Sequence, residues 1–158
     1  MKVLYPGTFD PLTFGHIDII NRAKHIFGMN SVVVGIAANA RKNPLFSVEE
    51  RMEFIGKHCQ PVTVATYEGL TVSFCRNKKI NVIIRGVRNQ LDFEYEYPIA
   101  CANKDLEPGI ETVFIMSDPS ISYVSSSMVK EIVSNRGLVT KFVPEDIAEA
   151  LEEKLLYE

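Results

Sequence analysis

The first sixteen residues bring a hydroxyl, glycines and an imidazole to the point where a strand passes into a helix. An apolar run at 3–5 leads through Pro-Gly-Thr-Phe-Asp-Pro into Thr-x-Gly-His, which ends at His16. The first N–H groups of a helix lack an intrahelical partner and the positive end of the helix dipole lies there, so such a junction stabilises a phosphate. The segment predicts a nucleotide site. The alternative is that its glycines and prolines are only turn residues and that His16 lies on the surface near a helix start.

The sequence lacks the common glycine-rich phosphate-binding motifs. The nine glycines form neither Gly-x-x-x-x-Gly-Lys-[Ser/Thr] nor Gly-x-Gly-x-x-Gly. This excludes P-loop proteins and dinucleotide-binding domains with the usual glycine fingerprint.

Basic residues and serines add to the phosphate chemistry. Lys42 lies in a loop restricted by Pro44, and Arg85 and Arg88 follow an apolar run. Planar guanidinium groups bind phosphate in a bidentate manner, so Arg85 at the end of a strand suits a polyphosphate. Three consecutive serines, 125–127, lie at an expected helix start, where capping alone explains one serine. We expect these serines to accept a phosphate or to cap the helix.

The elements that position these residues alternate between strand and helix. Apolar runs predict strands at 3–5, 31–38, 62–67, 82–84 and 112–116. Helical spacing and capping signals predict helices at 15–27, 47–58, 70–77, 93–104 with a kink or break at Pro98, one capped by Ser125, and 144–156. This order predicts an α/β, Rossmann-like domain spanning 1–158, with a five-stranded parallel sheet and helices on both faces. Ligands bind such sheets beyond the carboxyl ends of the strands, where strand order reverses.

Composition narrows the class of protein. The chain has 158 residues, 46% of them hydrophobic, which fits one compact domain without disulfides. Cys59, Cys75 and Cys101 are widely spaced and odd in number, so we expect reduced thiols and a cytoplasmic protein. We expect no signal peptide, membrane span or protein metal ligands. A net charge of −3 argues against general nucleic-acid binding.

These motifs together resemble one family over about residues 3–143. Pro-Gly-Thr-Phe-Asp-Pro with Thr-x-Gly-His, then Lys42, then Arg-Gly-Val-Arg with Asp-Phe-Glu-Tyr-Glu, then Ser-Ser-Ser-x-Val-Lys-Glu closely resemble the bacterial phosphopantetheine adenylyltransferases of the nucleotidylyltransferase superfamily. Thr-x-Gly-His alone indicates only the superfamily, whereas the arginine and acidic block is much more specific. The resemblance implies ATP and 4'-phosphopantetheine as substrates, Mg²⁺ with ATP, dephospho-coenzyme A and pyrophosphate as products, feedback by coenzyme A and a homohexamer.

The resemblance also implies roles for individual residues. His16 and Lys42 would act in catalysis, His16 by stabilising the transition state. The implied phosphopantetheine site consists of Thr8, Lys42, Thr71 and Arg85. The implied ATP site consists of Thr8, Phe9, His16, Gly86, Val87, Arg88, Glu96, Ile121, Ser122, Tyr123, Val124, Ser125, Ser126 and Ser127.

Two other functions remain open at this point. One is a transferase of the same superfamily that acts on nicotinate mononucleotide or glycerol phosphate, which the block from Arg85 to Glu96 disfavours. The other is a nucleotide-binding regulatory subunit without catalysis, which would never release pyrophosphate. The presence of both His16 and Lys42 favours an enzyme.

Overall fold

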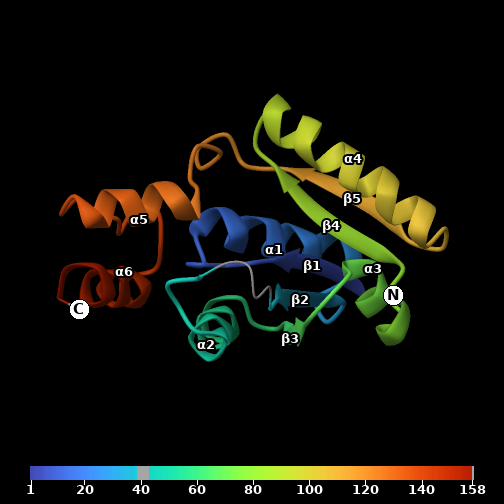
Figure 1. Cartoon of the computed structure of the whole chain (residues 1–158), viewed down its shortest axis with the longest axis horizontal. Helices are drawn as coiled ribbons and strands as arrows, with labels where there is room; N and C mark the ends of the chain where they lie inside the picture. The colour runs from blue at the N-terminus through green and yellow to red at the C-terminus, as the bar shows by residue number, and fades with distance from the viewer. Residues whose placement is uncertain (39–42, 158) are drawn as a thin grey trace.

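The computed structural model describes residues 1–38 and 43–157, which form a central sheet covered by helices (Figure 1). Its strands are β1 (Val3–Gly7), β2 (Val32–Ala37), β3 (Thr63–Tyr67), β4 (Val82–Val87) and β5 (Glu111–Met116). Its helices are α1 (Phe14–Phe27), α2 (Val48–His58), α3 (Thr71–Lys78), α4 (Gln90–Leu106), α5 (Ser126–Ser134), α6 (Glu145–Glu152) and the π-helical turn η1 (Glu153–Tyr157).

The sheet has the strand order β3-β2-β1-β4-β5, with every neighbouring pair parallel. This confirms the predicted five-stranded parallel sheet, and the order reverses between β1 and β4. The pairing of β1 with β4 covers only Val3 opposite Val82 and Leu4 opposite Ile83, near their amino ends. The carboxyl ends of these two strands are therefore free to bind a ligand, as expected at the switch point of an open α/β sheet.

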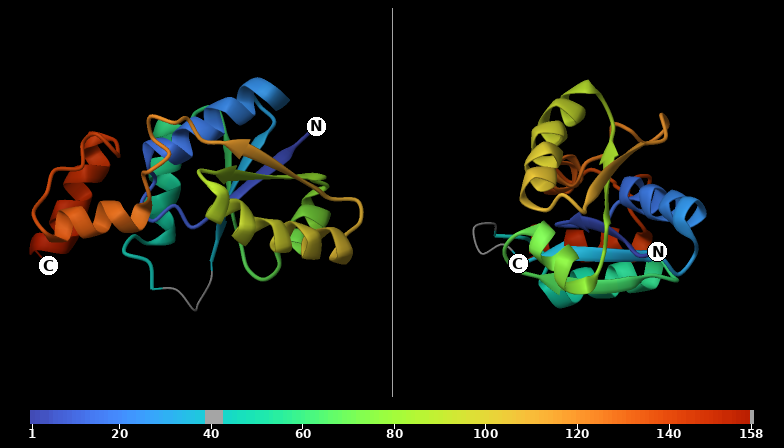
Figure 2. Two further views of the ribbon diagram at one scale, coloured as in Figure 1. Left: turned by 90° about the horizontal axis from the view of Figure 1, so that it is seen from above. Right: turned by 90° about the vertical axis from the view of Figure 1, so that its right-hand side faces the viewer.

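Alternate residues of the strands enter two separate cores, as the twofold period of a strand requires. On one face Val3, Tyr5 and Val34 pack with buried residues of α1 and α2. On the other face Leu4 and Val33 pack with buried residues of α3. Helices thus cover both faces, and α5 and α6 stand beyond the carboxyl ends of the strands (Figure 2).

Two of the predicted helix caps are confirmed. Ser47 and Glu50 form the expected capping box of α2, and the Ser125 side chain accepts a hydrogen bond from the Met128 N–H at 3.1 Å. Within the described residues, no helix is long and apolar enough to cross a membrane.

Three boundaries differ from the prediction. Strand β4 continues to Val87, so Arg85 and Gly86 lie inside it, because Arg85 still pairs in register with Phe114 of β5. Helix α4 begins at Gln90, capped by Asn89, and runs through Pro98 to Leu106 without a break. The last helix is divided into α6 and η1 rather than continuing as one α-helix over 144–156.

Candidate functional site

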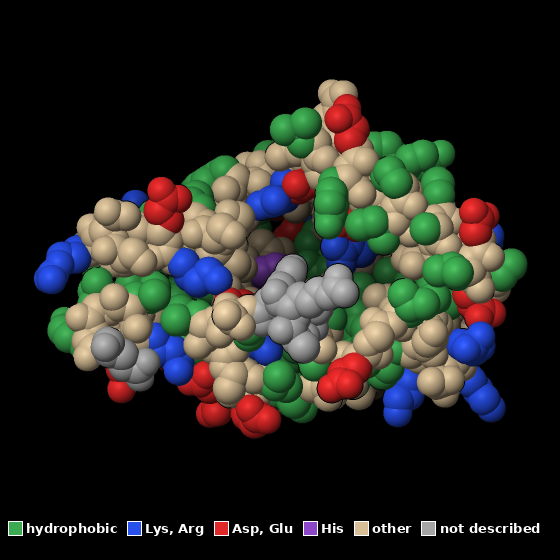
Figure 3. Space-filling view, viewed as in Figure 1, with side chains coloured by type: hydrophobic (Ala, Val, Ile, Leu, Met, Phe, Trp, Pro, Cys, Tyr) green, Lys and Arg blue, Asp and Glu red, His purple; other side chains and the backbone are tan. Residues whose placement is uncertain are grey.

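A cleft of about 600 Å³ opens at the carboxyl ends of β1 and β4. It is visible near the middle of the face in Figure 3, where acidic, basic and histidine side chains meet. Its volume suits a small-molecule ligand. Its walls come from β1 and the loop that follows it, the start of α1, the end of β4, Asp92 and Glu96 of α4, and the first turn of α5 with Lys130.

The loop after β1 forms one wall of the cleft, and its conformation depends on the contact between Gly7 and the ring of Phe9. Phe9 has a φ of 52°, in the left-handed region, and its ring is buried. A Cβ at Gly7 would lie 2.8 Å from Cζ of that ring, so glycine is required for the ring to lie where it does. The ring contacts the imidazole of His16 edge to face, with centroids 5.1 Å apart.

His16 occupies the third position of α1, where it completes a capping box with Thr13. The backbone N–H of Thr13 donates to Nδ1 of His16 at 3.1 Å. Burial and the nearby Arg88 and Arg85 guanidinium groups lower the pKa of His16 to about 4. At neutral pH the imidazole is therefore neutral, with its proton on Nε2, and can act as a hydrogen-bond donor.

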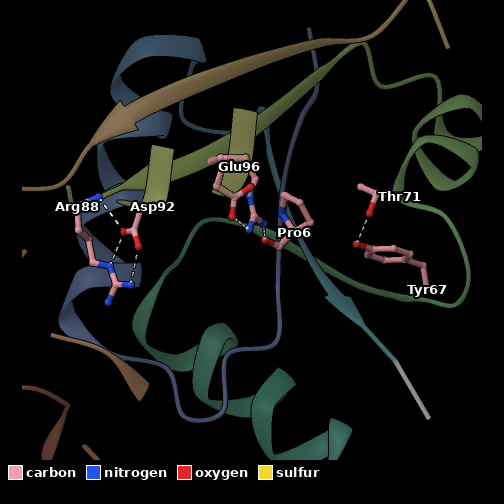
Figure 4. A network of polar contacts seen from close by, with 7 residues as sticks. Pro6, Tyr67, Thr71, Arg88, Asp92 and Glu96 are labelled. Carbon is pink, nitrogen blue, oxygen red and sulfur yellow. Dashed lines mark hydrogen bonds and ion pairs between the residues drawn. The ribbon is translucent and has the colours of Figure 1, made fainter. Parts of the chain in front are cut away.

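Arg85 projects from β4 and forms a two-point ion pair with Glu96 of α4, which Figure 4 labels close to Pro6. Its Nε donates to Oε2 of Glu96 at 2.7 Å and its Nη2 to Oε1. Its Nη1 donates to the Pro6 carbonyl at 2.8 Å, which joins β4 to β1 where ladder pairing has ended. Burial acts to lower the pKa of Arg85, but the hydrogen bonds and charge of Glu96 raise it above its usual value.

Arg88 connects three segments around the cleft. Its Nε and Nη2 donate to the Asp92 carboxylate at 2.7 and 3.1 Å, and its Nη1 donates to the Val124 carbonyl at 3.2 Å. Hydrogen bonding from Arg88 lowers the pKa of Asp92, so this carboxylate is ionised. The guanidinium thereby ties β4 and α4 to the segment that precedes α5.

Most of the residues predicted for the site line this one cleft. They are Thr8, Phe9, His16, Arg85, Gly86, Arg88, Glu96, Ile121, Val124, Ser125, Ser126 and Ser127. Val87, Ser122 and Tyr123 are not among the lining residues, since Val87 is buried in the sheet and Tyr123 is 61% exposed. Thr71 is also absent from the lining, and its hydroxyl hydrogen-bonds the Tyr67 hydroxyl at 3.0 Å. Lys42 lies outside the described residues.

The structure adds residues that were not assigned to the site from the sequence. Asp10 is buried and its carboxylate accepts a hydrogen bond from Nζ of Lys130 at 2.8 Å, and both residues line the cleft. The sequence indicates a place in the site for Lys130, because this residue follows Ser126 by four positions and so lies on the same face of the helix. Asp92 and Glu96 have the same spacing on α4.

No ready-made cage for a metal ion is visible in residues 1–38 and 43–157, where no group of three or more His, Cys, Asp or Glu side chains converges. Three carboxylates of the cleft, those of Asp10, Asp92 and Glu96, are each paired with a lysine or arginine. A divalent cation at this site would therefore need oxygen ligands from a bound substrate.

Comparison with known proteins gives consistent matches over most of the chain. The sequence model of the family described as Cytidylyltransferase-like matches residues 4–132. A phosphopantetheine adenylyltransferase of Leptospira biflexa is 46% identical over 154 residues, covering 96% of this chain and 95% of that protein. Proteins of the same name from Caldanaerobacter subterraneus and Proteus mirabilis are 44% and 42% identical, covering 96% and 98% of this chain and 95% and 96% of theirs.

A solved structure shares the fold. The lipopolysaccharide core biosynthesis protein from Thermoplasma volcanium superposes with a TM-score of 0.54 at 25% identity, covering 75% of this chain and 96% of that one.

Proposed function

The chain belongs to the phosphopantetheine adenylyltransferase family, and from this we propose that its cleft transfers the adenylyl group of ATP to 4'-phosphopantetheine. The products are dephospho-coenzyme A and pyrophosphate, in the penultimate step of coenzyme A synthesis. The observation that carries this proposal is that His16, Arg85, Arg88 and the first turn of α5 line one cleft.

The reaction needs no general base from the protein. The phosphate of phosphopantetheine has a second pKa of about 6, so at neutral pH it is mostly a dianion that attacks the α-phosphorus of ATP directly. The bond to pyrophosphate breaks as the new bond forms in line with it, with no covalent enzyme intermediate. What the protein supplies is alignment of two anions and stabilisation of the charge that develops between them.

The described residues suit that task. The neutral His16 imidazole offers its Nε2–H to the α-phosphoryl oxygens, and the free N–H groups at the start of α5 face the phosphate chain. The proposal assigns Gly86, Val87, Arg88 and Glu96 to ATP with Thr8, Phe9 and residues 121–127, and all of these except Val87, Ser122 and Tyr123 line the cleft. It assigns Thr8, Lys42, Thr71 and Arg85 to phosphopantetheine, and Lys42 also to the transferring phosphoryl group. Of these four, Thr8 and Arg85 line the cleft, Thr71 does not, and Lys42 lies outside the described residues.

Arg85 has a particular requirement for binding a phosphate. Its Nε and Nη2 are both engaged by Glu96, and its Nη1 by the Pro6 carbonyl. These contacts use three of its five N–H donors, so the phosphopantetheine phosphate must be placed where the second N–H of Nη1 and of Nη2 can donate to its oxygens.

Magnesium accompanies ATP in this proposal, held by phosphate oxygens and water. Support comes from the carboxylates of Asp10, Asp92 and Glu96, whose pairing with cations leaves them poorly suited as metal ligands. The ion supplies charge neutralisation on the phosphate chain when bound.

Assembly into a homohexamer is part of the same proposal, with α4 as a subunit contact. Glu96 is the buried residue of this 17-residue helix, whereas several of its apolar side chains are exposed. They are Leu91, Phe93, Tyr95, Tyr97, Ile99 and Leu106. Exposed apolar side chains gathered on one helix are what a subunit contact would bury.

Feedback and location complete the proposal. Coenzyme A, which shares the phosphopantetheine arm and the nucleotide with the product, competes at the same cleft.

A cytoplasmic location is supported by the three free thiols of Cys59, Cys75 and Cys101.

Product analysis tests the proposed function. Purified protein with ATP, magnesium and 4'-phosphopantetheine should form dephospho-coenzyme A and pyrophosphate in equal amounts, measured by mass spectrometry and a coupled phosphate assay. A protein that binds ATP but forms neither product would be a nucleotide-binding subunit instead.

A further inference from the structure

Arg51 is a buried arginine outside the cleft, on the first turns of α2. It is 3% exposed, and the hydrogen bonds of its guanidinium in the described structure go to backbone carbonyls. Nη1 donates to the Thr8 carbonyl at 2.9 Å and Nε donates to the Ser47 carbonyl at 3.1 Å. A buried charge is costly unless it is well hydrogen-bonded, so these two contacts hold Arg51 and the Thr8 carbonyl firmly together.

The Thr8 carbonyl belongs to the peptide that precedes Phe9, whose φ of 52° is unfavourable for a bulky side chain. Such a conformation is strained and persists only where the surroundings hold it. On the other side of Phe9, the buried Asp10 carboxylate accepts hydrogen bonds from the Leu45 N–H at 3.0 Å and the Phe46 N–H at 2.9 Å. Phe9 is therefore held from both sides.

The position of Phe9 bears directly on His16. The two rings meet edge to face at 5.1 Å with an interplanar angle of 70°. The Phe9 ring also contacts Tyr5, with centroids 5.5 Å apart. A change in the Phe9 backbone would therefore move the aromatic surface against which the imidazole rests.

We propose that Arg51 is a positioning residue for adenylyl transfer, which holds the Thr8 carbonyl and so sets Phe9 and the place of the His16 imidazole. This inference rests on the proposed function. Arg51 acts through the backbone of Thr8 and the ring of Phe9, and is separated from the cleft by them. Its effect is on the geometry of the transition state rather than on the strength of substrate binding.

Kinetics of Arg51→Gln and Arg51→Lys test this role. A misplacement of about 1 Å costs on the order of 100-fold in rate, so Arg51→Gln should lower kcat by about that factor. The KM values for ATP and phosphopantetheine should stay within about threefold, because uniform binding is retained. Arg51→Lys keeps the charge and one donor and should recover part of kcat. Arg76→Lys is the matched control, since Arg76 is exposed, lies on α3 and should leave kcat unchanged.

A second readout needs no substrate. In wild-type protein and Arg51→Lys labelled with ¹⁵N-histidine, the His16 ring signals should shift between the two, while the His25 and His58 signals stay in place. Unchanged kcat per folded molecule, unshifted His16 signals, or an Arg51→Lys protein that does not fold would each overturn the proposal. A wild-type protein that makes no dephospho-coenzyme A would instead contradict the proposed function, and the His16 signals would still report on Arg51.

Discussion

The backbone N–H of Thr13 donates a hydrogen bond to Nδ1 of His16, and this one contact fixes which ring nitrogen carries the proton. Because a backbone N–H can only donate, Nδ1 must accept, and the neutral ring bears its proton on Nε2. His16 thus fills the place that Glu or Gln holds in the usual capping box, while keeping a donor for a ligand. One side chain thus caps the start of α1 and, in the proposed function, donates to the substrate in the cleft.

Replacement of His16 separates these two roles. His16→Ala should lower kcat by about 100- to 1000-fold, the usual cost of removing a donor that stabilises transition-state charge. Loss of the cap should cost only about 1 kcal/mol of stability, measured by denaturant unfolding. His16→Gln restores the capping box, so its stability should match wild type while kcat stays low. His25→Ala, on the exposed side of α1, is the control, and a wild-type kcat in His16→Ala would refute the catalytic role.

The pH dependence follows from the low pKa of His16. With a pKa of about 4, the ring stays neutral where an ordinary histidine would titrate, near 6.5. The ratio of kcat between wild type and His16→Gln cancels titration of the substrate phosphate, and should be flat from about pH 8 to 5.5. An inflection of this ratio near the ordinary histidine pKa would contradict a neutral donor.

The lowered pKa of His16 also makes the free energy of unfolding depend on pH. The folded protein binds the proton on His16 less readily than the unfolded chain does. The contribution is therefore complete above the ordinary pKa of 6.5 and is lost as the pH falls toward about 4. Wild type and His16→Gln should therefore have equal unfolding free energies above pH 6.5, and wild type should become the less stable of the two as the pH falls toward about 4.

Removal of Arg85 should affect stability and substrate binding by separate routes. Arg85→Ala leaves the carboxylate of Glu96, which is 7% exposed, without its partner, and should cost about 2 to 3 kcal/mol. The pair Arg85→Met with Glu96→Leu should regain that stability, because an apolar pair avoids the uncompensated charge. Its KM for phosphopantetheine should remain raised. A double variant with wild-type KM would show that Arg85 only stabilises the fold.

Gly7 should tolerate no side chain. Gly7→Ala places a Cβ against the buried Phe9 ring, so the ring must move, at a cost of about 1 to 3 kcal/mol and with a fall in kcat. Gly56→Ala is the control within α2, where a Cβ would meet nothing within 4 Å. It should stabilise the protein by about 0.5 to 1 kcal/mol. Equal stability of the two variants would contradict this account of the loop.

The exposed face of α4 should be needed for assembly. Leu91 is 74% exposed, so Leu91→Glu should leave the folded subunit stable but lower the mass of the assembly, measured by light scattering after gel filtration. Leu138→Glu, at a residue that is 80% exposed beyond α5, should leave the mass unchanged. An unchanged mass for Leu91→Glu would remove this face from the subunit contact.

Much of the fold follows from local patterns in the sequence. The uninterrupted apolar run at 32–34 predicts strand β2, and the capping box at Ser47 predicts helix α2, both where the structure has them. The apolar run stops at Ile84 and so predicts too early an end for β4. The charged Arg85 is accommodated in the strand because Glu96 pairs with it. That pairing comes from tertiary structure, which periodicity does not reveal.

For the candidate site, too, local motifs predict some residues, whereas others are revealed only by tertiary contacts. Motifs at the carboxyl ends of β1 and β4 gave His16, Arg85 and Arg88, since parallel strands bring those ends to one edge. The left-handed Phe9 was not expected, because the conformation depends on Gly7 beside its ring and on Arg51 from α2.

The most direct test of this account is pyrophosphate release by the purified protein with ATP and magnesium, compared among three acceptors. Release with 4'-phosphopantetheine, and not with nicotinate mononucleotide or glycerol 3-phosphate, is the predicted result. Release with either of the other acceptors alone would keep the in-line mechanism and contradict the assigned substrate. If no pyrophosphate is released with any of the three acceptors, adenylyl transfer itself would be contradicted.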